Sequence, residues 1–120
     1  MTWRMISGGP VLPGNIDIRN IIDAIRGHGV RITDDADEEA TADRLLLDDV
    51  YFSVEHGDLV EDYPQDHPYP SGLIHGTSPV NDHIHSVWAN NSSNGGAVLA
   101  TVYRPDPARW IGRRIRRKPE

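Results

Sequence analysis

Three side chains in the second half of the chain have the types that acid–base chemistry requires. His85 carries an imidazole, a group that accepts or donates a proton near neutral pH. Tyr103 supplies a phenol, and the adjacent Arg104 supplies a guanidinium whose fork suits a phosphate. A purely structural role is the alternative, with His85 and Tyr103 as half-buried, hydrogen-bonded residues of a sheet and Arg104 as a solvated edge residue.

Several other histidines lie close to His85. His83 and His85 are two residues apart, which places both on one face of a strand, and His75 and His67 precede them. Such spacing is compatible with metal chelation, but the chain contains no cysteine and therefore no cysteine-type zinc site. We assign no metal ligand and no cofactor to these residues.

Charge is distributed unevenly along the 120 residues, whose formal net charge is −6. Asp34 to Asp66 includes 13 acidic residues and one basic residue, whereas Arg104 to Lys118 includes seven basic residues and one acidic residue. The basic end favours an anionic partner such as RNA. The residues predicted to contact it are Tyr63, Arg109, Arg113, Arg114, Arg116 and Arg117. A solvated helix end, or attraction between the two ends of the chain, is the alternative.

Helical spacing predicts three helices in the first half of the chain. The first carries isoleucines at positions 18, 21, 22 and 25 and ends at Gly27. The second begins at Asp34 or Asp35, with Glu38 and Glu39 near its positive end. The third is opened by Asp48 and ends at Gly57. Residues 1–14 are expected to form an irregular lead-in, and residues 15–120 a single domain.

Four strands are predicted after these helices, over Asp58–Tyr63, Gly72–Gly76, His83–Ala89 and Val98–Arg104. Short links between them favour a four-stranded antiparallel meander. Val30–Thr33 has room for only a brief strand. Because the helices cluster before the strands, the fold class is α+β, not a repeated βαβ array.

The strand ending at Arg104 is followed by a corner that favours a helix. Pro105 cannot extend a strand ladder, Asp106 is a good helix N-cap, and Pro107 suits the first helical position. A basic C-terminal helix is therefore expected after the sheet, with Pro105 and Trp110 forming a hydrophobic staple.

Several of these segments carry a family resemblance. They are D-V-Y-x-x-V-x-x-G-D-L-V-E-D-Y-P at Asp49–Pro64, P-Y-P-S-G-L-I-H-G at Pro68–Gly76, I-H-S-V at Ile84–Val87 and T-V-Y-R-P-D-P-A-R-W at Thr101–Trp110. Together they resemble a prokaryotic domain-of-unknown-function family of small proteins that end in Y-x-P-D-P-x-x-W. That family is similar to the RelE-like toxins of toxin–antitoxin pairs, which are small ribonucleases.

The resemblance implies a RelE-like fold and a metal-independent endoribonuclease, with His85 at the position of the family's histidine on the third strand. RNA, including mRNA on the ribosome, and a small antitoxin protein are the implied partners. The chain departs from the family at Asp35, where a histidine is usual, and an acidic residue there repels phosphate. A degenerate, non-catalytic relative that binds protein or RNA is therefore the alternative. The chain shows no signal segment and no membrane-spanning run, so we expect a cytoplasmic protein.

Overall fold

The computed structural model describes residues 16–91, 94–107, 110–111 and 115–116 of the chain. Three helices precede most of the strands: α1 (Ile18–Arg26), α2 (Asp34–Ala42) and α3 (Leu47–Glu55). The strands are β1 (Val30–Ile32), β2 (Asp58–Tyr63), β3 (Ser71–Thr77), β4 (His83–Asn91), β5 (Gly96–Tyr103), β6 (Trp110–Ile111) and β7 (Ile115–Arg116). The α+β class predicted from the sequence is confirmed. The predicted lead-in, residues 1–14, lies outside the described residues.

The main sheet has five strands in the order β1-β5-β4-β3-β2, so the four-stranded prediction is one strand short. Strands β2 to β5 pair with their sequence neighbours in antiparallel fashion, as short connections require. The added strand is β1, which pairs parallel to β5. A parallel partner needs a long crossover, here helices α2 and α3 with strands β2 to β4, and three residues of sequence do not reveal that pairing.

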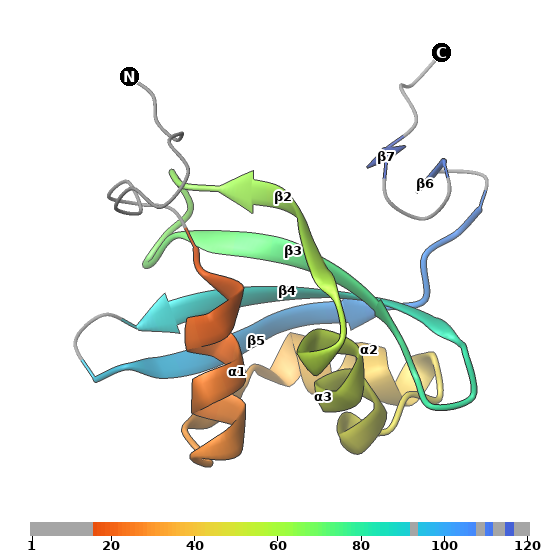
Figure 1. The fold of residues 1–120 in the computed structure, drawn as a ribbon, viewed down its shortest axis with the longest axis horizontal. Helices are drawn as coiled ribbons and strands as arrows, with labels where there is room; N and C mark the ends of the chain where they lie inside the picture. Colours follow the sequence, from red (N-terminus) through yellow and green to blue (C-terminus); the bar gives the residue numbers. More distant parts are fainter. Residues whose placement is uncertain (1–15, 92–93, 108–109, 112–114, 117–120) are drawn as a thin grey trace.

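The three helices lie on one side of the five-stranded sheet, drawn below it in Figure 1. The core between these layers includes Ile21 of α1, Val50 and Val54 of α3, and Ile74, Ile84 and Trp88 of the sheet. Trp88 is fully buried, and its indole nitrogen donates a hydrogen bond to the Ser86 hydroxyl at 2.9 Å. Gly76 lets α3 approach β3 closely, because a Cβ there would lie 1.9 Å from the Ser53 carbonyl oxygen.

The helix boundaries follow from capping. Asp17 caps α1 by accepting a hydrogen bond from the Arg19 backbone at 2.9 Å, and Thr33 caps α2 by accepting one from Ala36 at 3.1 Å. Helix α3 begins one residue before the predicted Asp48, after Leu46, and has no side-chain cap. No helix among the described residues is long and apolar enough to cross a membrane.

The prediction of a basic C-terminal helix is wrong for the described residues beyond β5. Trp110–Ile111 and Ile115–Arg116 instead pair as the short antiparallel strands β6 and β7, and Asp106 caps no helix. The sequence itself explains why a helix is disfavoured here. Gly112 is a poor helix former, and the like-charged pairs Arg113/Arg117 and Arg114/Lys118 would repel each other four residues apart on a helix.

A bulge in β5 interrupts the regular alternation that the sequence predicts there. Val87 faces Thr101, but the next β4 residue, Trp88, faces Leu99, so Ala100 is the extra residue. Burial changes phase at the same place: Ala97 and Leu99 are buried before the bulge, and Val102 is buried after it. All residues from Ala97 to Val102 are small or apolar, so their types do not show this change.

Helix α2 holds the bulge in place. The Thr33 hydroxyl donates to the Ala100 carbonyl at 3.1 Å. The Glu39 carboxylate accepts a hydrogen bond from the Thr101 hydroxyl and another from the Val102 backbone N–H, the latter at 3.1 Å. Helix α2 and its cap thus supply hydrogen-bond partners to backbone groups of β5 at the bulge.

Truncating Glu39 tests this role. Glu39→Ala should lower the free energy of unfolding by about 2 kcal/mol, because a half-buried backbone N–H and a hydroxyl lose a charged acceptor. Glu38→Ala is the matched control on the exposed side of the same helix and should change stability by less than about 0.5 kcal/mol. Urea unfolding of both variants gives the comparison, and equal losses would contradict the role of Glu39.

Candidate functional site

Four titratable side chains form a continuous row on one face of the sheet, and we call His83, His75, His85 and Tyr103 the histidine–tyrosine row. Pairing places His75 of β3 opposite His85 of β4, and His85 opposite Tyr103 of β5. His83 lies two residues before His85 and therefore on the same side of β4. Ile74 and Ile84, the adjacent residues on β3 and β4, enter the core under the helices, so the row faces away from them.

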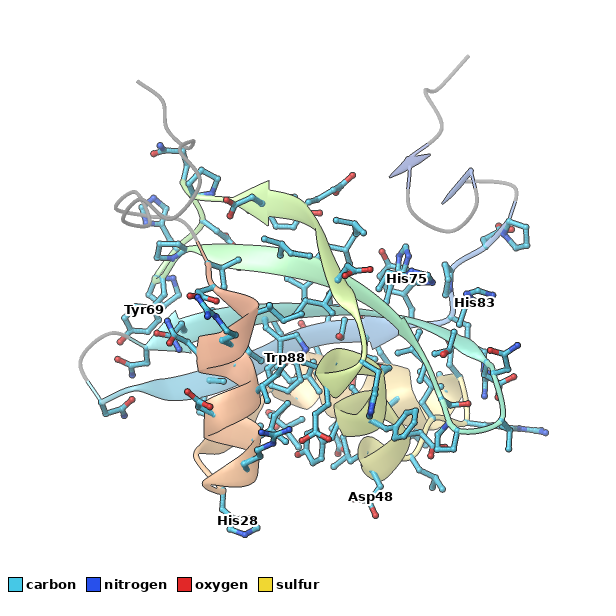
Figure 2. All side chains as sticks on the ribbon, in the orientation of Figure 1. His28, Asp48, Tyr69, His75, His83 and Trp88 are labelled. Carbon is cyan, nitrogen blue, oxygen red and sulfur yellow. The ribbon has the colours of Figure 1, made fainter. Side chains whose placement is uncertain are left out.

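Side-chain contacts join the members of the row. His85 Nδ1 lies 3.3 Å from the Tyr103 hydroxyl oxygen, and the two rings meet edge to face with centroids 5.3 Å apart. His75 Nε2 lies 2.9 Å from His83 Nδ1, and these rings are nearly parallel at 8°. The His75 and His85 rings complete the row in an edge contact, with centroids 5.5 Å apart. Figure 2 shows His75 and His83 beside each other on neighbouring strands.

Exposure differs along the row. His85 is 0% exposed and His75 is 8% exposed, whereas His83 and Tyr103 at the two ends are half-buried. Solvent therefore reaches the two ends of the row but not the His85 ring. Buried imidazoles need hydrogen-bond partners, and both inner rings have them within the row.

The structure brings His85 and Tyr103 together, as acid–base chemistry requires, but it directs Arg104 elsewhere. The Arg104 guanidinium forms an ion pair with Asp82 at 3.1 Å and donates to the Asp43 carbonyl at 2.9 Å. The Arg104 backbone N–H donates to the Asp43 carboxylate, also at 2.9 Å. This arginine ties the end of β5 to the C-terminus of α2 and to the turn before β4.

Two of the predicted RNA contacts, Tyr63 and Arg116, lie among the described residues. Tyr63 lies level with Ser71, four residues or about 13 Å along β3 from His75, and its hydroxyl donates to Glu61. Arg116 lies in β7, where it pairs with Trp110. Arg109, Arg113, Arg114 and Arg117 lie outside the described residues.

Sequence reasoning gave His75 and His83 no role in proton transfer. The sequence indicates them only by position. His75 lies between Ile74 and Gly76 on a strand that must pair with the strand carrying His83 and His85. Recognising the contact required the register between β3 and β4, because a shift of one residue would send His75 to the other face.

One surface cavity of the described chain lies away from the row. This cavity of about 380 Å³ lies at the opposite end of the sheet, and its lining includes His28, Arg31, Asn91 and Asn94. None of the predicted site residues lines this cavity. Within the described part of the chain, no group of three or more His, Cys, Asp or Glu residues is arranged to hold a metal ion. We place the candidate site at the histidine–tyrosine row because its groups can exchange protons.

Fold and site together define an α+β domain with an imidazole and phenol row on the face of its sheet that points away from the helices. The chain belongs to a family described as Domain of unknown function (DUF4258), whose model matches residues 32–104. The match runs from the end of β1 to the residue after β5 and includes all four members of the row. No curated protein and no solved structure matches this chain.

Replacing Arg104 tests its structural role. Arg104→Gln should lower the free energy of unfolding by about 1 kcal/mol, since it removes a guanidinium contact to a backbone carbonyl and a partly exposed ion pair. Arg31→Gln is the control, because Arg31 is exposed and forms no ion pair among the described residues. Thermal and urea unfolding measure both, and an Arg104→Gln variant as stable as the control would contradict the assignment.

Proposed function

We propose that this protein is a metal-independent endoribonuclease related to the RelE-like toxins. The observation that supports the proposal most directly is the contact between His85 Nδ1 and the Tyr103 hydroxyl, on adjacent strands of the face that points away from the helices. Imidazole and phenol can transfer protons without a metal ion. The similarity of the chain's motifs to the toxin-related family, including Y-R-P-D-P-A-R-W at Tyr103–Trp110, supports the same class of reaction.

The reaction proposed is internal transesterification of RNA. A base removes the ribose 2′-OH proton, the 2′ oxygen attacks phosphorus, and the bond from phosphorus to the 5′ oxygen breaks. An acid protonates the departing 5′ oxygen, which gives a 2′,3′-cyclic phosphate and a 5′-hydroxyl. Tyr103 is half-buried at the end of the row and supplies this acid. His85 is the positioning residue, because its ring is fully buried and its Nδ1 lies 3.3 Å from the phenol oxygen, to which the Nδ1–H tautomer donates.

The residues proposed to bind phosphate differ from those proposed to transfer protons. Arg104 is occupied by Asp82 and Asp43, so the proposed phosphate contacts come from Arg109, Arg113, Arg114, Arg116 and Arg117. RNA, including mRNA on the ribosome, is the proposed substrate, and a small antitoxin protein is the proposed partner. We place the protein in the cytoplasm, where both occur.

A non-catalytic binding module is the second candidate, and the outer surface of α2 favours it. Asp34, Asp35, Asp37 and Glu38 are exposed there, and Asp35 stands where the resembling family has a histidine. Such a surface repels RNA and suits a basic protein segment. Induced expression in a bacterial host separates the two candidates. Arrested growth with cleaved RNA supports the nuclease, whereas unchanged growth with a co-purifying basic protein supports the binding module.

Removing the phenol tests the catalytic assignment. Tyr103→Phe should lower the rate of RNA cleavage by about a hundredfold, the usual size of a general acid contribution, with little loss of stability. Tyr69→Phe is the matched control, because Tyr69 lies in the loop before β3 and outside the row. Cleavage is followed in EDTA, with analysis of the product ends. Unchanged cleavage by Tyr103→Phe, or cleavage that stops in EDTA, would contradict the proposal.

Neutralising the basic tail tests the binding assignment. Replacing Arg113, Arg114, Arg116 and Arg117 with glutamine should weaken RNA binding and reduce the slope of log K against log salt by about 3 for single-stranded RNA. Rates at saturating RNA should change little, because these residues are assigned to affinity. Replacing Arg19 and Arg26 of α1 with glutamine removes two positive charges and is the control for charge lost outside the tail. Equal salt slopes in all three proteins would show that the tail does not contact RNA.

A further inference from the structure

We infer that His83 is the group that removes the 2′-OH proton and that His75 orients it. The inference rests on the proposed ribonuclease function and supplies the base that the pair of His85 and Tyr103 lacks. No sequence motif singles out this pair, and it emerges from the register between β3 and β4.

The contact between the two rings defines a single shared proton. His75 Nε2 and His83 Nδ1 are 2.9 Å apart, so one nitrogen must donate and the other must accept. When His83 Nδ1–H donates to His75 Nε2, the remaining nitrogen of His83 keeps its lone pair and can accept a proton. The nearly parallel arrangement of the rings, at 8°, restrains His83 in this orientation.

The difference in burial between the two rings indicates which one acts as the base and which one orients it. His75 is 8% exposed, and its ring also meets the His85 ring edge to face, so it is held from both sides. His83 is half-buried and begins β4, where the chain leaves the turn at Asp82. The more exposed ring can meet a substrate, while the inner ring receives its Nδ1 proton and stabilises the imidazolium that forms. This is the general arrangement of a base oriented by a third group.

Position relative to Tyr103 completes the argument. Tyr103 lies opposite His85, two residues along β4 from His83, so His83 and Tyr103 are diagonal neighbours on one face. Diagonal residues in antiparallel strands have Cβ atoms about 7–8 Å apart. A phosphodiester bound over this diagonal would have a base on one side and an acid on the other.

The proton balance closes without another reactant. The 2′-OH proton passes to the outer nitrogen of His83, the oxygen–phosphorus bond forms, and the bond to the 5′ oxygen breaks as Tyr103 donates its proton. The resulting imidazolium returns one proton through water to the Tyr103 phenolate, which restores both groups.

The other histidines of the described chain supply controls. His56 lies at the end of α3, where its Nδ1 contacts the Phe52 carbonyl oxygen at 3.0 Å, and His67 lies in the exposed loop before β3. Neither contacts the row. Substitution of either one with glutamine should leave cleavage within twofold of the wild-type rate.

The experiment combines nitrogen-15 NMR of the full chain with cleavage kinetics. The wild-type spectrum should show neutral His83 with its proton on Nδ1. His75→Phe keeps a ring but removes the acceptor nitrogen, and it should return His83 to the Nε2–H form that unconstrained imidazole favours. His83→Gln should lower kcat at least a hundredfold with KM within threefold, and His75→Phe should lower kcat tenfold or more. Imidazole added to the buffer should restore part of the activity of His83→Ala.

The outcomes distinguish this inference from the proposed function. A wild-type His83 that carries its proton on the outer nitrogen, or a His83→Gln variant with full activity and intact fold, overturns the role of His83 alone. A wild-type protein that shows the Nδ1–H signature and cleaves no RNA overturns the ribonuclease assignment, and the catalytic role of His83 with it.

Discussion

The bulge at Ala100 is the constraint on which the candidate site depends. Before the bulge, Trp88 faces Leu99; if that register continued, His85 would face Val102 and not Tyr103. Tyr103 would then fall on the side of the sheet that the helices cover, because side chains alternate between faces. One extra residue therefore turns the phenol toward the imidazole and sends Val102 into the core.

Helix α2 makes the bulge stable, which gives its acidic sequence a structural purpose. Thr33 caps the helix and contacts the Ala100 carbonyl, and Glu39 one and a half turns later binds Thr101 and Val102. A helix with few large apolar residues depends on such contacts for its position. The exposed acids of α2 are a separate feature, since they point away from the sheet and add charge to the surface.

Polar residues form different kinds of hydrogen bond on the two faces of the sheet. On the helix side, Ser86 is fully buried and accepts the hydrogen bond of the Trp88 indole, so this pair is satisfied within the core. On the side away from the helices, three imidazoles and a phenol contact one another across three strands. Every member of that row can both donate and accept, so a proton added at one end alters the hydrogen bonding of its neighbours.

The sequence predicted the positions of the helices and strands better than the pairing between the strands. Periodicity located α1, α3 and strands β2 to β5 to within a few residues, because these segments have one clear apolar face. It did not reveal the bulge, since Ala97 to Val102 are all small or apolar, nor the parallel pairing of β1, which depends on distant residues. His85 and Tyr103 were chosen from residue type and resemblance, whereas His75 and His83 required the observed register.

Charge explains why the candidate site and the basic residues occupy different segments. Three arginines of the described domain form ion pairs with its own carboxylates: Arg19 with Asp17, Arg26 with Glu55, and Arg104 with Asp82. Its remaining surface is rich in carboxylates, which oppose the approach of RNA. Under the proposed function, positive charge for a phosphate near the row comes from the arginines that follow β5 in the sequence. Because Tyr103 ends β5, the segment that follows it is the shortest route by which such charge can be brought to the row. The proposed RNA cleavage site, built from imidazole and phenol on an acidic domain, is therefore consistent with a basic segment that begins immediately after β5.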